Sequence, residues 1–435
     1  MARPSVLVIG GGFGGLSAVQ HLRTADADVT LLDRRNFHLF QPLMYQVATG
    51  SLSPGEIAAP LRSILNRQRN TRVLLGEAAD LDPAQRVVTL SDDTQFHYDQ
   101  LVVATGSKTS YYGHDEWRAF AQCPKSIEES TEIRRKIFYA FEAAERAAAD
   151  TDEARSWLTF VIVGAGATGL ELAGALAEIA RQTLRHDFRA IRPQSSRILL
   201  IEVAPRVLPA YPEDLSRHAQ ALVERLGVQV LTNARVLDIS EDAVTYEHDG
   251  TTTRLPTKTV LWAGGIAPTP FGELVAKRTS APTDRAGRIQ VGPDLTVPGH
   301  PEIFVVGDLA AAAGPGGGSL PGLAPVAMQE GAYAARVINA RLRGVSAVPA
   351  FRYFNRGDMA VIGRAAAVAN VFGVHVWGWP AWLLWLFIHL LYIVEFQSRL
   401  LVFIEWGFLY LTYSRGARLI TGPPAPGERG ANPRL

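Results

Sequence analysis

Cysteine is nearly absent from this chain of 435 residues, which contains Cys123 and no other. A single cysteine forms no disulfide framework and supplies no cysteine metal site, so both are excluded, and a reducing compartment fits this composition. A charge excess is lacking too, because 43 basic and 42 acidic residues leave a formal net charge of +1. We therefore expect no nucleic-acid partner, and we find no residue cluster that predicts a metal site.

A secretory signal pattern is also missing. The first apolar run, residues 6–9, is short and leads straight into glycines without a small-residue cleavage site. We therefore expect no signal peptide.

Residues 6–33 contain an apolar run, a glycine turn, a helical stretch and a second apolar run that ends on an acid. Gly10 permits a tight turn, Gly12 lets the backbone approach a pyrophosphate, and Gly15 lets the helix pack closely on the strand. The helix N-terminus offers N–H donors to phosphates, and Asp33 can accept hydrogen bonds from a ribose diol. The pattern predicts a site for a nicotinamide or a flavin dinucleotide, and a plain glycine-rich loop is the weaker alternative.

The same order of features returns in residues 157–202. Gly164, Gly166 and Gly169 follow an apolar run, a helical stretch comes next, and a strand ends at Glu202. Two such motifs arise by chance far less often than one, so we expect the chain to bind two nucleotides. A carboxylate at Glu202 repels a 2′-phosphate and favours NADH over NADPH, although Arg206 follows four residues later.

Three further apolar runs end in glycine turns, namely residues 101–106, 260–265 and 303–308. In a nucleotide-binding fold such turns bring the backbone close to the cofactor. The third run ends in Gly-Asp, and we expect Asp308 to reach the ribityl chain of a flavin; the alternative is an ordinary turn. Periodicity predicts helices at residues 57–65 and across residues 126–154.

A run of 19 residues without a formal charge covers residues 376–394. Its length alone would nominate a membrane-spanning helix. Pro380 is expected at the start of the helix, which would then cover residues 381–394 and measure about 21 Å at 1.5 Å per residue, against a ~30 Å hydrocarbon core. The next apolar run, residues 400–413, is equally short and is interrupted by Glu405, so we expect neither helix to span a membrane.

We expect these C-terminal helices to lie in a membrane interface, with tryptophan and tyrosine at headgroup level and Arg415 and Arg418 facing anionic lipid. Five of the eight tryptophans fall in this region. Residues 351–435 also contain eight arginines, no lysine and four acidic residues, which gives them a positive charge. The alternative is that the helices form a buried core or a dimer interface.

Over essentially its whole length the chain resembles the type II NADH dehydrogenases, the single-subunit NADH:quinone oxidoreductases that do not pump protons. The resemblance is carried by FHLFQPLMYQVATGSLSPGEIAAPLR (37–62), GAGATGLELAGALAE (164–178), LPGLAPVAMQEG (320–331) and YLTYSRGARLITG (410–422). It implies a flavoprotein that oxidises NADH by hydride transfer to FAD and passes two electrons to a membrane quinone, either menaquinone or ubiquinone. Disulfide reductases and sulfide:quinone oxidoreductases of this superfamily need at least two thiols, so the single cysteine excludes both.

The resemblance implies an α/β fold with two Rossmann-like dinucleotide-binding domains, similar to glutathione reductase, and a C-terminal membrane-associated amphipathic helical segment. Residues 1–120 and 285–350 would form the FAD-binding domain, and residues 155–284 the NADH-binding domain. Residues 351–435 would anchor the chain to the membrane.

The resemblance also assigns residues to the two cofactors. The residues expected to hold FAD are Gly10, Gly12, Phe13, Gly15, Asp33, Arg34, Thr105, Gly106, Gly307 and Asp308. The residues expected to hold NADH are Gly164, Gly166, Thr168, Gly169, Glu202, Gly264 and Gly265.

Two side chains are expected in catalytic roles. Glu171 matches a family glutamate near the nicotinamide, and it is also an acid in the first turn of a helix, which the helix dipole favours. Gln329 would orient the quinone. The quinone site would comprise Ala324, Pro325 and Gln329, and it departs from the family pattern, because the family carries a pair of glutamines and Pro325 replaces the first of them.

The implied location is peripheral and monotopic, at the cytoplasmic face of the inner (plasma) membrane, and the paired C-terminal helices make a homodimer plausible. Two other hypotheses stay open. In the first, the chain is an FAD- and NADH-binding redox sensor without quinone turnover. In the second, it is an NADH reductase that passes electrons to a protein.

Overall fold

The computed structural model describes residues 3–147, 150–314, 317–345 and 347–422. The described residues form two compact units. The first unit takes those within Met1–Leu39, Ala58–Lys108 and Ile266–Phe354, and the second takes those within Phe40–Ile57, Thr109–Gly265 and Asn355–Leu435. The predicted division into cofactor domains stays a prediction, because these units are defined by packing and not by what they bind.

The first unit is built on a six-stranded sheet. Its strands, in spatial order, are β21 (Thr296–Val297), β22 (His300–Val305), β9 (Gln100–Val103), β1 (Ser5–Ile9), β2 (Asp28–Asp33) and β5 (Thr71–Leu75). All neighbouring pairs are parallel except β21 with β22. The four strands that precede the predicted FAD residues therefore end at the same edge of the sheet.

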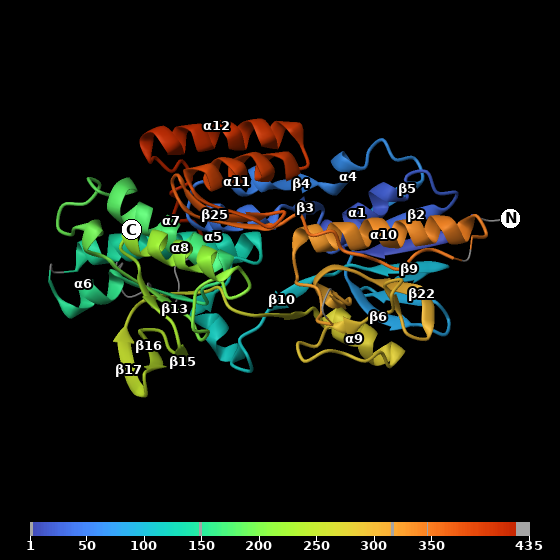
Figure 1. Cartoon of the computed structure of the whole chain (residues 1–435), viewed down its shortest axis with the longest axis horizontal. Helices are drawn as coiled ribbons and strands as arrows, with labels where there is room; N and C mark the ends of the chain where they lie inside the picture. Colours follow the sequence, from blue (N-terminus) through green and yellow to red (C-terminus); the bar gives the residue numbers. More distant parts are fainter. Residues whose placement is uncertain (1–2, 148–149, 315–316, 346, 423–435) are drawn as a thin grey trace. The chain divides into compact units, whose positions relative to one another are not determined.

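Two helices of the first unit lie side by side, α1 (Phe13–His21) and α10 (Ala324–Leu342) (Figure 1). Their close approach depends on glycine, because a Cβ atom on Gly331 would lie 2.0 Å from the carbonyl oxygen of Gly14. Alternate residues of the sheet, such as Leu7, Leu101 and Ile303, belong to a buried apolar core. The smaller elements of this unit are β3 (Phe37–Leu39), β4 (Ala58–Pro60), α4 (Leu61–Ile64), β6 (Ala78–Asp82), β7 (Val87–Leu90), β8 (Gln95–His97), β19 (Ile266–Pro268), α9 (Pro270–Thr279), β20 (Ile289–Gln290) and β23 (Ala310–Ala311).

The second unit repeats this plan with a five-stranded parallel sheet. Its strands, in spatial order, are β11 (Ala121–Gln122), β18 (Thr259–Trp262), β12 (Thr159–Val163), β13 (Arg197–Ile201) and β14 (Gln229–Leu231). Val161, Leu199 and Val260 are core residues of this sheet. The α-helices of this unit before residue 265 are α2 (Met44–Ala48), α3 (Pro54–Ile57), α5 (Ile127–Arg146), α6 (Asp152–Trp157), α7 (Ala167–Glu178) and α8 (Glu213–Arg225). An antiparallel meander contains β15 (Ala234–Ile239), β16 (Ala243–His248) and β17 (Thr251–Pro256).

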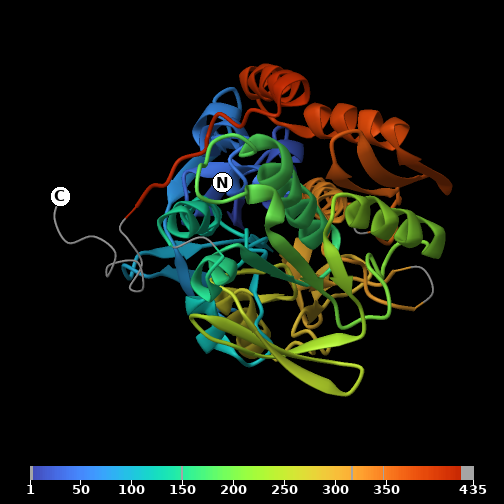
Figure 2. The same cartoon turned by 90° about the vertical axis from the view of Figure 1, so that its left-hand side faces the viewer.

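The C-terminal part of the second unit begins with an antiparallel sheet of β24 (Asp358–Gly363), β25 (Ala366–Val371) and β26 (Val374–Gly378). Helix α11 (Trp379–Tyr392) packs on this sheet, and α12 (Phe396–Thr412) lies beside α11 (Figure 2). Pro380 occupies the first turn of α11, where its missing N–H costs nothing. Within the described part of the chain, no helix is long and apolar enough to cross a membrane.

Two predicted helices differ from the structure. The expected helix at residues 57–65 is interrupted by β4, which pairs with β3. Pro60 lacks an N–H and disfavours helical backbone at the residue before it. Helix α3 therefore ends at Ile57, and a separate helix, α4, begins at Leu61. The expected helix at residues 126–154 is also two helices, since α5 ends at Arg146 and α6 has its own cap, the Thr151 side chain accepting from the Ala154 N–H.

Candidate functional site

The first glycine turn joins β1 to α1, and its three motif glycines meet different constraints. Gly10 has φ +100°, a conformation that favours glycine. A Cβ atom on Gly15 would lie 1.8 Å from the carbonyl oxygen of Gly10, so a side chain there would force the helix away from the strand. A Cβ atom on Gly12 would meet nothing within 4 Å. The fold therefore requires Gly10 and Gly15, whereas Gly12 leaves open space beside the helix N-terminus.

The second glycine turn joins β12 to α7 and has the same geometry. Gly164 has φ +99°, a Cβ atom on Gly169 would lie 1.8 Å from the Gly164 carbonyl oxygen, and a Cβ atom on Gly166 would meet nothing within 4 Å. Thr168 is exposed in the first turn of α7. The internal repeat found in the sequence is thus a repeat in three dimensions.

The two predicted acids also occupy equivalent positions. Asp33 accepts hydrogen bonds from the Gly11 N–H at 2.5 Å and the Arg35 N–H at 2.7 Å. Glu202 accepts from the Ala165 N–H at 2.6 Å and the Ala204 N–H at 2.8 Å. Each carboxylate closes its own glycine turn, and since a carboxylate offers about four acceptor positions, each retains capacity for a ribose diol.

Burial changes the pKa of Asp33, the first of these acids. The pKa of Asp33 is raised by burial, and the hydrogen bonds from the turn and the nearby Arg34 and Arg35 oppose that rise. Arg34 itself is largely exposed and lies 3.6 Å from Glu77. Phe13 packs edge-on against the ring of His38, which is bonded through Nδ1 to the Gly11 carbonyl oxygen at 2.9 Å. His38 is a buried support of this turn that the sequence did not identify.

The Gly-Asp turn after β22 lies at the same sheet edge. Gly307 has φ +74°, and Asp308 accepts a hydrogen bond from the Ser107 hydroxyl at 2.5 Å. The turn after β9 holds Thr105, which is bonded to Thr269 at 2.7 Å, and Gly106, which has φ +71° and open space in front of it. The structure therefore gathers all the predicted FAD residues at the carboxyl edge of one sheet, the usual place for ligands in such folds.

A buried acid behind the Gly-Asp turn escaped the sequence analysis. Glu330 on α10 is fully buried and accepts a hydrogen bond from the Gly307 N–H at 2.5 Å. Among the described residues its second oxygen, Oε1, has no hydrogen-bond partner. Burial raises the pKa of Glu330 to about 8, and Asp308 adds to the rise. Nothing in the local sequence distinguishes this glutamate from an exposed helical one.

The predicted quinone-site residues lie at the start of α10. Ala324 is its first residue, and Pro325 sits in the first turn, where a proline is tolerated. The Gln329 amide is already engaged, since it donates to the Phe354 carbonyl oxygen and accepts from the Phe354 N–H, both at 3.0 Å. In this structure Gln329 thus holds the backbone that follows α10.

In the second unit, the turn after β18 completes the predicted NADH residues. Gly264 and Gly265 follow the strand end, and Gly265 has φ +80°. The ring of Tyr112 lies against Gly265, close enough that a Cβ atom there would be 2.7 Å from it. Trp262 donates to the Ser110 carbonyl oxygen at 3.0 Å. Tyr112 is largely exposed, and sequence reasoning did not associate it with this turn.

Glu171 of α7 lines a cavity under α11 and α12. The cavity is partly open to solvent and contains about 610 Å³ of empty space when that open part is included, and all its lining residues belong to the second unit. Its aromatic lining residues are Tyr45, Trp382, Trp385, Trp406, Tyr410 and Tyr413. Burial raises the pKa of Glu171 well above its usual value, and the hydrogen bond from the Val361 backbone opposes that rise.

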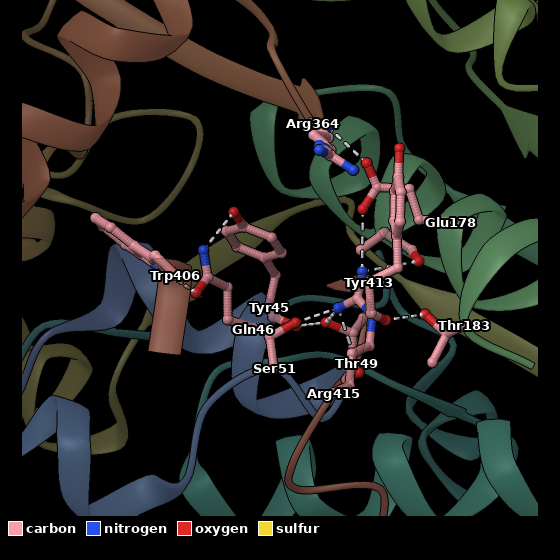
Figure 3. A network of polar contacts seen from close by, with 11 residues as sticks. Tyr45, Gln46, Thr49, Ser51, Glu178, Thr183, Arg364, Trp406, Tyr413 and Arg415 are labelled. Atoms are coloured by element: carbon pink, nitrogen blue, oxygen red, sulfur yellow. Dashed lines mark hydrogen bonds and ion pairs between the residues drawn. The ribbon is translucent and has the colours of Figure 1, made fainter. Parts of the chain in front are cut away.

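The chain segment after α12 is fastened beside this cavity (Figure 3). The buried Arg415 guanidinium donates to Glu178 at 3.1 Å, to the Thr49 hydroxyl at 3.3 Å and to the Ser51 hydroxyl. The expectation that Arg415 faces lipid is therefore wrong, because its charge is buried against Glu178. Glu178 also accepts from the Arg364 N–H at 2.6 Å. Breaking one partner of such a buried ion pair leaves an uncompensated charge, so this contact fixes the end of α12 against α7.

Comparisons with known proteins agree on one group. The family model described as pyridine nucleotide-disulphide oxidoreductase matches residues 4–331. The chain is 42% identical to the type II NADH:quinone oxidoreductase Ndh of Mycobacterium tuberculosis, over 97% of this chain and 91% of that protein. It is 44% identical to NdhA of the same organism, over 96% and 90%. The structure of NDH2 from Plasmodium falciparum in complex with NADH has the same fold, with a TM-score of 0.87 at 20% identity, covering 95% of this chain and 99% of that one.

Because Gly12 and Gly166 have open space around them, substitutions at these positions test nucleotide binding without disturbing the fold. Gly12→Ala and Gly166→Ala should fold normally, because both positions have extended backbone that alanine adopts. A methyl group at these positions would occupy the space of the bound diphosphates. Gly12→Ala should therefore lower the flavin content of the purified protein at least tenfold, and Gly166→Ala should raise the KM for NADH at least tenfold. Absorbance spectra, NADH titrations and thermal unfolding check this.

Gly15→Ala is the contrasting variant and should unfold at a markedly lower temperature. Unchanged flavin content in Gly12→Ala, together with an unchanged KM in Gly166→Ala, would contradict the assignment of the two turns.

Glu330 should make stability depend on pH. The folded chain binds a proton at Glu330 up to about pH 8, whereas the unfolded chain loses it near pH 4.5. Stability should therefore fall as pH rises through this interval, by up to about 1.4 kcal/mol per pH unit. Glu330→Gln keeps an acceptor for the Gly307 N–H and should remove that slope in unfolding experiments from pH 5 to 9. Parallel curves for the two proteins would show that Glu330 titrates normally.

Proposed function

The chain belongs to the type II NADH:quinone oxidoreductases and to the pyridine nucleotide-disulphide oxidoreductase family, and we propose that it works with FAD as resident cofactor at a membrane surface. It is an enzyme that oxidises NADH and reduces a quinone. The observation that carries the proposal is the duplicated strand, glycine turn, helix and acid, one copy in each unit. Two such sites suit two dinucleotides.

The residues of the first unit fit FAD. Gly12 leaves room for a diphosphate at the N-terminus of α1, Asp33 has acceptor capacity for a ribose, and Asp308 follows β22 at the same sheet edge, where it would bind a ribityl chain. When bound, FAD accepts a hydride and gives up two electrons. The chain itself supplies the binding groups and, through Glu330 and His38, fixes the turns that present them.

The residues of the second unit fit NADH. Gly166 offers the same open approach to the N-terminus of α7, and Glu202 has acceptor positions for the ribose diol. A carboxylate there disfavours a 2′-phosphate, which supports NADH over NADPH. Tyr112 against Gly265 supplies an aromatic ring beside the proposed dinucleotide.

The quinone headgroup would enter the aromatic cavity under α11 and α12. A quinone ring is planar and uncharged, as the indole and phenol walls require. Reduction to quinol consumes two protons taken up from solvent, and the Glu171 carboxyl, whose pKa burial raises, lies on the wall of this cavity. Gln329 is not among the lining residues of this cavity, and its role in orienting the quinone stays a separate proposal, for which its amide would have to exchange its bonds with Phe354.

The outer faces of α11 and α12 support monotopic attachment to a membrane. On α11 the exposed residues Trp379, Leu383, Phe387 and Leu391 recur every four positions, which places them on one side of the helix. On α12 the exposed apolar residues are Phe396, Leu400, Leu401, Phe403, Ile404, Phe408 and Leu411. Such an apolar surface suits a membrane, which we propose is the anionic cytoplasmic face of the inner membrane because NADH is present there, and the alternative is that the surface pairs two copies in a dimer.

Anaerobic mixing tests the electron path. NADH should bleach the flavin of the purified protein, and a menaquinone or ubiquinone analogue should then restore the oxidised spectrum. Bleaching without reoxidation by either quinone would favour the sensor or the protein-acceptor hypothesis. A flavin that NADH leaves oxidised would overturn the proposed reaction.

Substitutions confined to the exposed apolar side of α11 and α12 test membrane attachment. The triple variant Phe387→Glu/Phe403→Glu/Phe408→Glu should bind anionic vesicles at least tenfold more weakly in sedimentation assays, because carboxylates are repelled by the surface and resist burial in lipid. NADH:ferricyanide reduction should be unchanged, and the matched Phe→Leu triple variant should still bind. Vesicle binding that persists in the Glu variant would contradict the proposal, and a change from dimer to monomer would assign the face to a second copy.

A further inference from the structure

Three side chains at the wall of the aromatic cavity are hydrogen-bonded in series (Figure 3). Trp406 of α12 donates from Nε1 to Gln46 Oε1 at 2.7 Å, and Gln46 donates from Nε2 to the Tyr45 hydroxyl oxygen at 2.8 Å. All three residues are buried and line the cavity. The series connects a helix of the proposed membrane surface to α2.

The direction of this series is fixed by its first member. An indole N–H is a donor only, so the Gln46 carbonyl must face Trp406 and the Gln46 NH2 group must face Tyr45. The Tyr45 oxygen is therefore the acceptor of that bond, and its own proton has to be donated elsewhere. Among the described residues, this proton has no acceptor.

The phenol remains a donor at physiological pH. Burial raises the pKa of Tyr45 well above its usual value, and the nearby Glu171 and Glu178 add to the rise. A deprotonated phenolate, which would be an acceptor, is thus disfavoured.

A second donor on the cavity lining is also unused. Trp385 is 1% exposed, and its Nε1–H has no hydrogen-bond partner among the described residues. Arg415, which also lines the cavity, has a third such donor, since its Nε has no partner among the described residues. Leaving buried donors unsatisfied is costly, so these donors on one cavity point to a ligand that brings acceptors. A quinone carries two carbonyl oxygens on an apolar ring and no donor of its own, which matches this wall.

We propose that the Tyr45 hydroxyl donates a hydrogen bond to a carbonyl oxygen of the quinone headgroup, and that Gln46 and Trp406 are positioning residues that aim it. The proposal rests on the proposed function, in which the quinone occupies this cavity. A donor at the carbonyl stabilises the negative charge that develops on the oxygen during reduction. Because Trp406 belongs to α12, the position of that helix determines where the Tyr45 hydroxyl donates its proton.

Tyr45→Phe tests the contact by binding. We would measure the affinity of the oxidised holoenzyme for menadione, a naphthoquinone, and for 2-methylnaphthalene, which has the same ring without carbonyls, by equilibrium dialysis. The Kd for menadione should rise three- to tenfold, the usual effect of losing one neutral hydrogen bond, and the Kd for 2-methylnaphthalene should stay the same. The KM for menadione should rise in parallel, and the rate of flavin bleaching by NADH should be unchanged.

Trp406→Phe tests the series. Without the indole donor, Gln46 is free to turn its carbonyl toward Tyr45 and take the proton that the quinone would accept. This variant should therefore weaken menadione binding in the parent chain and have little further effect when Tyr45→Phe is already present. A purely structural role of Trp406 would add to the Tyr45→Phe effect instead.

Tyr98→Phe is the matched control. It removes a hydroxyl that is buried in the core of the first unit and has no partner in the described part of the chain, and it should leave both affinities unchanged. Menadione affinity that is unchanged in Tyr45→Phe would overturn the inference, and so would an equal loss for both ligands. A parent enzyme that fails to bind or reduce menadione, although NADH bleaches its flavin, would overturn the quinone cavity and the inference together.

Discussion

Each unit depends on a helix that approaches the preceding strand so closely that only glycine fits. A Cβ atom on Gly15 or Gly169 would lie 1.8 Å from the carbonyl oxygen of the first motif glycine. This contact directs the N-termini of α1 and α7 at the carboxyl edges of their sheets. An acid from the next strand, Asp33 or Glu202, then closes each turn from the other side. Dinucleotide binding follows from this geometry, because N–H donors, open space and a carboxylate meet at one edge.

The features that the sequence predicted are those encoded within about 40 consecutive residues. Strand, glycines, helix and acid follow one another, so both repeats and both acids could be found without tertiary information. His38, Ser107 and Glu330 could not, because their importance comes from contacts with Gly11, Asp308 and Gly307 across the unit. The helix expected at residues 57–65 was wrong for two reasons: β4 pairs with β3 across the unit, and Pro60 is a local helix breaker that the periodicity did not take into account.

Helices α11 and α12 have an outer and an inner side, and we propose a different role for each. The sequence indicated short apolar helices, and the structure adds that their outer sides are exposed while Trp385 and Trp406 point inward. The inner side forms a cavity with Glu171 of α7 and Tyr45 of α2, and Arg415 fixes the following segment to Glu178. The proposed membrane surface and the proposed quinone site are thus opposite sides of the same two helices.

The central claim is that the first repeat holds FAD and the second takes NADH. A crystal structure of the protein with both dinucleotides bound tests it most directly. Our account places the FAD diphosphate against Gly12 with Asp33 on its ribose, and the NADH diphosphate against Gly166 with Glu202 on its ribose. The reverse arrangement, or a repeat that contacts neither diphosphate, would contradict it.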